Sequence, residues 1–450
     1  MDLGKDKISR LFIKLLLPTI AGMIFSSIFV VVDGIMVGKG IGSEGLAGVN
    51  LISPLFTLSA GLGLMFGMGG SVLASEALGS GHIKQARTYT FFTLKLAMIS
   101  SLLTLTFLLI FADETLSLLG VPEDLSDKAS QYYYPLIPAI FFNVLMTAGL
   151  FFIRLDGAPS FAMICVAISS IGNIFLDWLF IFPFGLGMFG AALATTLSQV
   201  AGFGIMVHYI VRRARIFRFS SMKLQSSEEE KKLSLTGRIV SIGFPAFLGD
   251  LSISFMVILG NFVFNKYVGV DGIAAFSVVC FIFPIIFMAY NAIVQSVQPI
   301  ISYNYKQNTD RALQALRLSL MVVTVCGLLF SATAWIEGER IVSLFLGKET
   351  TAWELAVEGF GLFGIGFLFF GMNILFIGYM QSVGIVKQSI RFTVLRGGIL
   401  TVIAFVLLPL ILGDNGIWLA VPMAEIISFI CISIYIAPQT AHIYLRKDNS

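Results

Sequence analysis

The segment GSEGLAG at residues 42–48 returns as GVDGIAA at 269–275, 227 residues further along the chain. Two further pairs keep this spacing to within one residue: Pro18 with Pro245, and GMFGAALA at 187–194 with GDNGIWLA at 413–420. One spacing that holds through three separate segments indicates an internal repeat rather than a shared composition. We therefore expect two related halves that join near the middle of the chain.

The composition is typical of a membrane protein. Of the 450 residues, 57% are hydrophobic and only 12% are charged, about half the ~25% of an ordinary soluble domain. At ~20 apolar residues per membrane span, this is enough apolar sequence for about a dozen spans. A soluble fold of this composition would have too little polar surface, which excludes a soluble enzyme, a disordered chain and a nucleic-acid-binding protein.

Twelve apolar runs are long enough to cross a membrane, and they are continuous rather than alternating, so they predict helices and not barrel strands. They lie at about 12–37, 47–75, 90–111, 132–153, 160–182, 190–211, 239–265, 273–300, 313–335, 355–380, 390–411 and 416–437. The expected fold is an all-α integral membrane protein with twelve transmembrane helices in two pseudo-twofold-related six-helix bundles. The expected parts are an N-terminal lobe at 1–211, a cytoplasmic linker loop at 212–238 and a C-terminal lobe at 239–450.

The distribution of basic residues predicts the orientation. With the N-terminus in the cytoplasm, 23 of the 29 Lys and Arg residues fall in cytoplasmic segments, Arg396 among them, and five fall outside. The opposite orientation would invert this bias. We expect a multi-pass protein of the cell (inner) membrane with both termini in the cytoplasm.

Several familiar motifs and features carry no function here. The four cysteines form no C-x-x-C pair, so neither disulfides nor a zinc site are expected. The first apolar run extends past the length of a signal-peptide core and is followed by no A-x-A site, so no cleavable signal is expected. Two G-x-G-x-x-G matches, at 185–190 and 359–364, lie in no βαβ unit and are chance matches. The chain contains no Walker and no H-E-x-x-H sequence, which argues against a nucleotide motor and against an enzyme. We also expect no cofactor.

The repeat serves as a control for polar residues inside the membrane. Four of them in the first half align with apolar or small residues in the second: Asp33 with Gly260, Asn173 with Leu400, Asp177 with Ala404, and Thr195 with Val421. Both halves should share the requirements of the scaffold. The asymmetry therefore predicts chemistry that the first half performs alone.

The chemistry of these four residues is that of a cation site. Asn173 and Asp177 are four residues apart, so they project from one face of a helix. An ionised carboxylate in the membrane costs several kcal/mol unless it is paired or hydrated. Two carboxylates, an amide and a hydroxyl offer the oxygen ligands that a small cation prefers, so the cluster can hold a proton or a sodium ion. The alternative is a polar network that only locks three helices together.

Other polar or helix-bending residues have weaker signals. Asp250 and Glu425 lie in apolar runs of the second half, where either can attract a cationic substrate or act as a structural pair partner. Pro18 should bend the first helix about four turns before Asp33, as a hinge or as a static kink. Gly63-x-x-x-Gly67 is a small-xxx-small pair and predicts close helix packing.

Five segments resemble the multidrug and toxic compound extrusion (MATE) family, in its prokaryotic DNA-damage-inducible-type branch. They are VVDGIMVG at 31–38, ASEALGSGHIKQA at 74–86, GNIFLDWLF at 172–180, GMFGAALATTLSQ at 187–199 and QPIISYNYKQNTDRA at 298–312. The resemblance implies a cation site formed by an acid of the first helix, an Asn and an Asp of the fifth and a Thr of the sixth. Asp33, Asn173, Asp177 and Thr195 match these positions. It also implies antiport, in which protons or sodium ions enter while amphipathic, often cationic, drugs leave; it does not settle the ion.

Three other interpretations have distinguishable sequence features. A lipid-linked oligosaccharide flippase of the same broader superfamily should line its cavity with Arg and Lys, whereas the spans here contain almost none. A major-facilitator transporter would carry a D-R-x-G-R-R-type loop where this chain has GSGHIKQAR. A membrane enzyme would need a nucleophile–base pair or a metal set, and neither is present. The expected partners are small-molecule drugs and the lipid bilayer, with no nucleic acid, and the expected state is a monomer.

Overall fold

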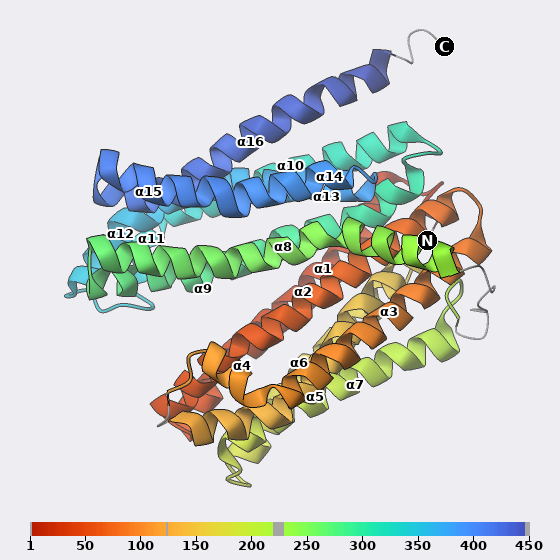
Figure 1. Ribbon diagram of the computed structural model, residues 1–450. Helices are drawn as coiled ribbons and strands as arrows, with labels where there is room; N and C mark the ends of the chain where they lie inside the picture. Colours follow the sequence, from red (N-terminus) through yellow and green to blue (C-terminus); the bar gives the residue numbers. More distant parts are fainter. Residues whose placement is uncertain (1, 123–124, 219–228, 446–450) are drawn as a thin grey trace. The chain divides into compact units, whose positions relative to one another are not determined.

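The computed structural model describes residues 2–122, 125–218 and 229–445, and all regular elements in these ranges are helical (Figure 1). The α-helices and two π-helices are α1 (Ile8–Gly40), α2 (Ser43–Gly79), α3 (Ile83–Ile110), α4 (Ala112–Leu118), α5 (Ser126–Leu155), α6 (Pro159–Ile181), α7 (Gly187–His208), η2 (Tyr209–Arg213), α8 (Glu229–Tyr267), α9 (Val270–Asn304), α10 (Thr309–Ile336), α11 (Gly338–Val342), α12 (Thr351–Gly364), α13 (Gly366–Ser382), α14 (Val386–Val394), η4 (Leu395–Leu400), α15 (Thr401–Leu412) and α16 (Asp414–Leu445). The predicted all-α fold is confirmed.

The predicted membrane spans are confirmed as well. Among the described residues, eleven helices are long and apolar enough to cross a membrane, and one bent pair completes twelve. The pair is Thr351–Gly364 and Gly366–Ser382, which meet at 42°. A Cβ atom on Gly366 would lie 3.0 Å from the Cα atom of Pro422, so glycine allows α13 to approach α16 closely at the bend.

The chain forms two compact units. Unit 1 contains Met1–Phe247 and Gln295–Ala312, and unit 2 contains Leu248–Val294 and Leu313–Ser450. Helices α8, α9 and α10 therefore each contribute one part to each unit. The lobe boundaries expected from the repeat, 1–211 and 239–450, remain a prediction.

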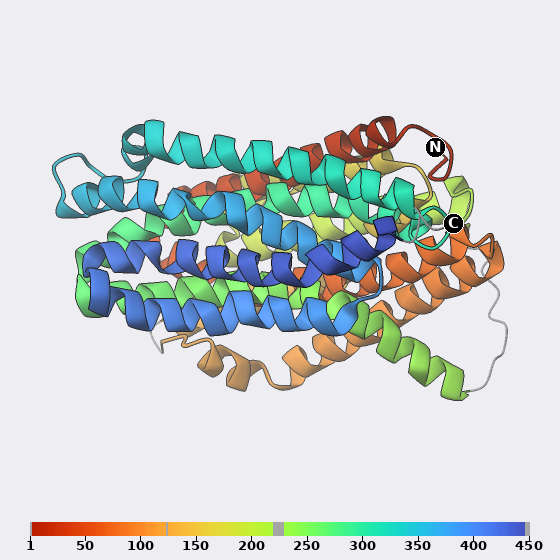
Figure 2. The ribbon, with the colours of Figure 1, turned by 90° about the horizontal axis from the view of Figure 1, so that it is seen from above.

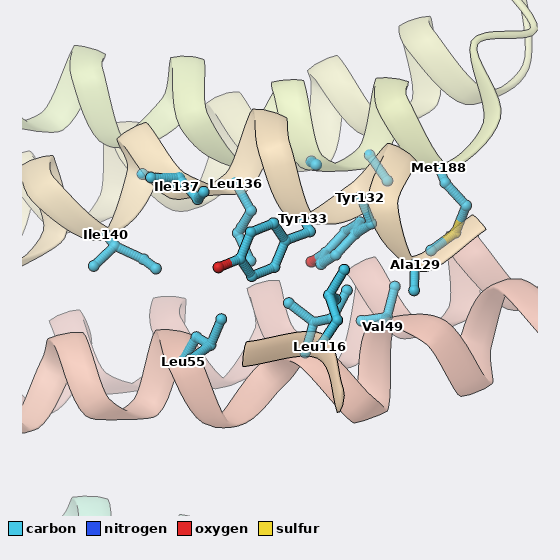
Figure 3. Close-up of a cluster of buried hydrophobic side chains, with 14 of the residues drawn as sticks. Val49, Leu55, Leu116, Ala129, Tyr132, Tyr133, Leu136, Ile137, Ile140 and Met188 are labelled. Carbon is cyan, nitrogen blue, oxygen red and sulfur yellow. The ribbon is translucent and has the colours of Figure 1, made fainter. Parts of the chain in front are cut away.

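Helix α5 is the core of unit 1. It packs against α2, α3 and α7, and a much larger share of its apolar residues is buried than in α1 or α3. In Figure 3, the side chains of Tyr132 and Tyr133 extend from α5 towards α2, which carries Val49 and Leu55. A polar hydroxyl in this setting needs a partner, and Tyr133 donates to the carbonyl oxygen of Leu108 at 2.8 Å.

The glycine pair of α2 allows its close packing on α5. A Cβ atom on Gly63 would lie 2.6 Å from Cβ of Thr147, and one on Gly67 would lie 2.4 Å from Cδ2 of Phe151. Real Cβ atoms do not come this close to their neighbours, so any larger residue would push the helices apart. The predicted role of Gly63 and Gly67 in helix packing is confirmed.

Two contacts in unit 1 join residues that are repeat mates. Ser71 and Gln298 are hydrogen-bonded at 3.3 Å, and Gln307 donates to Ser80 at 2.6 Å; both pairs are 227 residues apart in sequence. Equivalent residues meet each other only where a twofold axis passes between them. These bonds agree with the pseudo-twofold relation that the sequence predicts.

The start of the predicted linker at 212–238 is bound to unit 1. The buried carboxylate of Asp156 accepts hydrogen bonds from the backbone N–H groups of Arg215 at 2.9 Å and Ile216 at 2.7 Å, and from the Tyr209 hydroxyl at 2.7 Å. Arg87 donates to the carbonyl oxygen of Ile216 at 2.7 Å. Helix α8 begins at Glu229, within the predicted loop, and residues 219–228 of that loop lie outside the described part.

The helices of unit 2 pack around α16. Helices α12, α13, α15 and η4 all contact it, and α15 and α16 appear side by side in Figure 2. Aromatic side chains fill much of this core: the ring of Phe283 lies 4.5 Å from that of Phe370 and 5.7 Å from that of Phe363. Such contacts suit a membrane protein, because packing rather than hydrophobic burial drives helix association in lipid.

Candidate functional site

Three helices of unit 1 bring the four predicted site residues together. Asp33 comes from α1, Asn173 and Asp177 from α6, and Thr195 from α7, and α6 packs against both of the other helices. All four side chains are buried, with exposed fractions of 9% for Asp33, 1% for Asn173, 0% for Asp177 and 3% for Thr195. The cluster therefore lies inside the helical bundle and not at its surface.

The side-chain amide of Asn173 connects Asp177 of α6 with Thr195 of α7. In the orientation that satisfies both of its ends, its nitrogen donates to Oδ2 of Asp177 at 2.7 Å and its oxygen accepts from the backbone N–H of Thr195 at 3.2 Å. The hydroxyl of Thr195 donates to the carbonyl oxygen of Ala191 at 3.2 Å, which leaves its lone pairs available as a ligand. The amide thus holds Asp177 against α7.

The two carboxyl groups are neighbours. Asp33 and Asp177 lie within hydrogen-bonding reach of each other, and Oδ1 of each is buried without a partner in the described structure. Two carboxylates in a water-poor site repel each other unless a proton or a cation lies between them. Their free oxygen atoms, together with the Thr195 hydroxyl, form a set of oxygen ligands suited to a proton or a small cation.

The sequence did not reveal the fifth member of this cluster. Tyr132 of α5 is 5% exposed; its phenol interacts with the side chain of Thr195 and lies close enough to Asp33 and Asp177 to interact with their charges. The comparison of repeat halves would have found it, because a spacing of 227 pairs Tyr132 with Gly359. A tyrosine hydroxyl both donates and accepts, so it can orient the threonine or contact a bound cation.

The two weaker candidates differ in their surroundings. Glu425 of α16 is buried and forms an ion pair with Arg396 of η4, with Nη1 and Oε1 at 3.5 Å; it also accepts from the Asn373 amide at 2.7 Å. Asp250 of α8 is half-buried and makes no hydrogen bond or ion pair with the described residues. Of the two, Glu425 thus has the pair partner that the sequence offered as an alternative.

The position of Arg396 corrects the sequence-based expectation. The charge distribution places it among the cytoplasmic cations, whereas it lies inside the candidate span Val386–Leu412 and is only 3% exposed. Arg154 is also buried, at the end of α5, where it donates to Oε1 of Gln295 at 2.9 Å. The spans therefore contain buried cations. Polar side chains from other helices and aromatic rings stabilise their charges.

No group of three or more His, Cys, Asp or Glu side chains that could hold a metal occurs among the described residues. The unit 1 cluster has two carboxylates, and its remaining oxygen ligands come from an amide and hydroxyls. Such a set is too weakly charged for a typical divalent site and suits a monovalent cation or a proton.

Comparison with known families gives two matches within this chain. The MatE family model matches residues 18–179 and again 245–407. The two matches begin 227 residues apart, at Pro18 and Pro245, which agrees with the repeat read from the sequence.

Individual proteins similar to this chain cover nearly all of it. The multidrug export protein MepA of Staphylococcus aureus is 24% identical over 421 residues, which span 92% of this chain and 90% of MepA. A multidrug resistance MATE family transporter of the MOP superfamily, solved in an outward-facing conformation, has a TM-score of 0.90 at 21% identity and 98% coverage of both chains. A MOP superfamily transporter from Pyrococcus furiosus, described as having a binding pocket of reverse polarity, has a TM-score of 0.89 at 20% identity, covering 98% of this chain and 97% of that one.

Proposed function

The chain belongs to the MatE family of membrane transporters, and from this membership we propose that it is a secondary active multidrug efflux antiporter. It exports amphipathic, often cationic, compounds in exchange for protons or sodium ions. The multidrug export protein and the transporters to which it is similar support this substrate class. We place it in the cell (inner) membrane as a monomer with both termini in the cytoplasm.

The observation that carries the proposal is the buried cluster of Asp33, Asn173, Asp177 and Thr195. It combines unpartnered carboxylate oxygens with an amide and a hydroxyl, and it has no polar counterpart in the other repeat. A polar network that only joined helices would be expected to pair nearly all of its buried oxygen atoms. An ion-coupled antiporter requires a site that alternately binds and releases a cation, and the unpaired oxygens serve that purpose.

Cation binding at this cluster changes the charge on α1 at Asp33. Neutralising that charge changes how α1 packs against α6, and packed helices tend to adopt discrete arrangements. Pro18 lies on the same helix and is the proposed hinge, although α1 is continuous from Ile8 to Gly40 in this structure. When the drug is neutral, one cation entering across ~100 mV supplies about 2.3 kcal/mol, enough for a drug gradient of nearly fiftyfold.

Dye efflux from cells tests the proposal. Asp33→Asn and Asp177→Asn should each reduce efflux to the level of cells without the transporter, at membrane amounts equal to wild type. Asp113→Asn, which neutralises an exposed acid on α4, is the matched control and should retain efflux. Wild-type efflux from both cluster variants would refute the assigned site.

A flippase for lipid-linked oligosaccharides is the second candidate, and the buried Arg154 and Arg396 are the observations in its favour. Against it, the charge of Arg396 is balanced by Glu425. A panel of toxic compounds decides between the two. Protection against amphipathic cations supports drug efflux, whereas transport of anionic sugar lipids alone supports the flippase.

A further inference from the structure

Unit 2 contains a buried ion pair whose geometry is unusually loose. The side chains of Arg396 and Glu425 are 3% and 7% exposed, and Nη1 and Oε1 lie 3.5 Å apart. Strong arginine–carboxylate pairs instead form two parallel hydrogen bonds at 2.7–2.9 Å. The second carboxylate oxygen, Oε2, accepts from Asn373, and the ring of Phe370 lies 5.0 Å from the guanidinium carbon.

Several polar atoms of Arg396, of Asn373 and of Ser428, which follows Glu425 by one turn of α16, have no hydrogen-bond partner in the described structure. They are Nε and Nη1 of Arg396, Oδ1 of Asn373 and Oγ of Ser428, and all of their side chains are at least nine-tenths buried. The guanidinium is therefore held by charge and by the aromatic ring, without fitted hydrogen bonds. A purely structural pair of this depth would be expected to satisfy its donors.

The residues around Arg396 are of the same kinds as those in the unit 1 cluster. Each unit combines a buried carboxylate, an amide and a hydroxyl: Asp33 and Asp177 with Asn173 and Thr195 in unit 1, and Glu425 with Asn373 and Ser428 in unit 2. This is a ligand set for a monovalent cation. In unit 2 a guanidinium, which is itself a monovalent cation, lies against the carboxylate.

The repeat shows that the fold does not require this charge pair. At spacings of 227 and 226, Arg396 and Glu425 align with Ser169 and Gln199, which are neutral and buried in unit 1. The π-helix η4 carries Arg396, and the hydroxyl of Thr401 donates to its carbonyl oxygen at 2.7 Å. Single π-turns often occur at functional positions, because the extra residue redirects a side chain.

We propose that Arg396 is a tethered cation occupying a latent monovalent-cation site formed by Glu425, Asn373 and Ser428. Its charge excludes sodium ions and protons from this site, so that of the two clusters only the one in unit 1 binds the coupling cation. The existence of the site does not depend on the proposed function, but its role in setting the number of coupling cations does. Arg396 is thus a specificity-determining residue.

On its own helix, Glu425 is accompanied by the titratable residues Asp414, Cys431 and Tyr435. Of the helices packed against α16, α12 carries Glu354 and Glu358, α13 carries Tyr379 and α15 carries no titratable residue. The ion pair recorded for Glu425 is with Arg396. Removal of the guanidinium therefore leaves a buried carboxylate whose charge must be balanced by a proton or by another cation.

Cation binding to purified protein tests this in the background Asp33→Asn/Asp177→Asn, in which the unit 1 cluster is neutral. Radioactive sodium binding and proton uptake are measured in detergent. The parent should bind no cation at these sites, and adding Arg396→Met should restore one sodium ion or one proton per chain. Adding Glu425→Gln to that variant should abolish the gain. Arg391→Met, which removes an exposed charge five residues away, is the matched control and should produce no gain.

The outcomes separate this inference from the proposed function. Equal cation binding with and without Arg396, in folded protein, overturns the tethered-cation proposal. Cation binding by the parent with Arg396 intact instead overturns the assignment of the unit 1 cluster.

Folding of the variant gives a second measurement. If Arg396→Met fails to fold at neutral pH without salt, sodium or acid should restore its folded yield, and Glu425→Gln should remove that requirement. Failure to fold under every cation condition, or folding that no cation affects, also counts against the proposal.

Discussion

Replacing Tyr132 with Phe tests whether the fifth member of the cluster acts on the bound cation. The substitution removes one hydroxyl and keeps the buried ring, so it opens no cavity of the size that Tyr→Ala would create. A hydrogen bond contributes about 1 kcal/mol net. If the Tyr132 hydroxyl orients Thr195 for the cation with a contribution of this size, its loss should weaken cation binding about fivefold, since 1.4 kcal/mol is tenfold.

The neighbouring tyrosine provides the control. Tyr133→Phe also removes one buried hydroxyl from α5, but that hydroxyl donates to Leu108 in the hydrophobic core and not to the cluster (Figure 3). Both variants should lose about 1 kcal/mol of stability. Only Tyr132→Phe should shift the cation dependence of drug binding.

The assay is drug binding to purified protein, by fluorescence, over a series of proton and sodium concentrations. For Tyr132→Phe the cation concentration that halves drug binding should rise about fivefold, and for Tyr133→Phe it should not move. Identical cation dependence in the two variants would show that the Tyr132 hydroxyl only supports the packing of α5. The reasoning would then be refuted for this residue.

Three further predictions concern coupling and packing. In wild type, acid or the coupling ion should weaken drug binding, because antiport requires each ligand to disfavour the other; Asp33→Asn should bind drug independently of both, and unchanged affinity in wild type would contradict the coupling. Gly67→Val should destabilise the protein by ~1–3 kcal/mol in thermal unfolding, whereas Gly34→Val, where no atom lies within 4 Å, should not; equal midpoints would contradict the close packing. Asp156→Ala should release the chain near Ile216 and speed its cleavage in limited proteolysis, with unchanged cleavage as the contrary result.

The sequence by itself determined the membrane spans and the repeat. Span prediction succeeds because a helix in lipid must satisfy its own backbone and present apolar side chains for its whole length, so the signal is local and strong. The repeat then identified Asp33, Asn173, Asp177 and Thr195 as residues particular to one half. Tyr132, whose mate Gly359 is a glycine, is a fifth residue particular to the first half.

Only the tertiary structure decided which polar groups meet. The ion pair of Arg396 with Glu425 joins residues 29 positions apart on different helices. The hydropathy of each segment cannot predict such a contact. For the same reason, the sequence does not reveal that Arg396 is buried between an aromatic ring and a carboxylate. Local periodicity shows which face of a helix is apolar. The partner of a buried charge depends on how separate helices pack, which is a property of the folded chain.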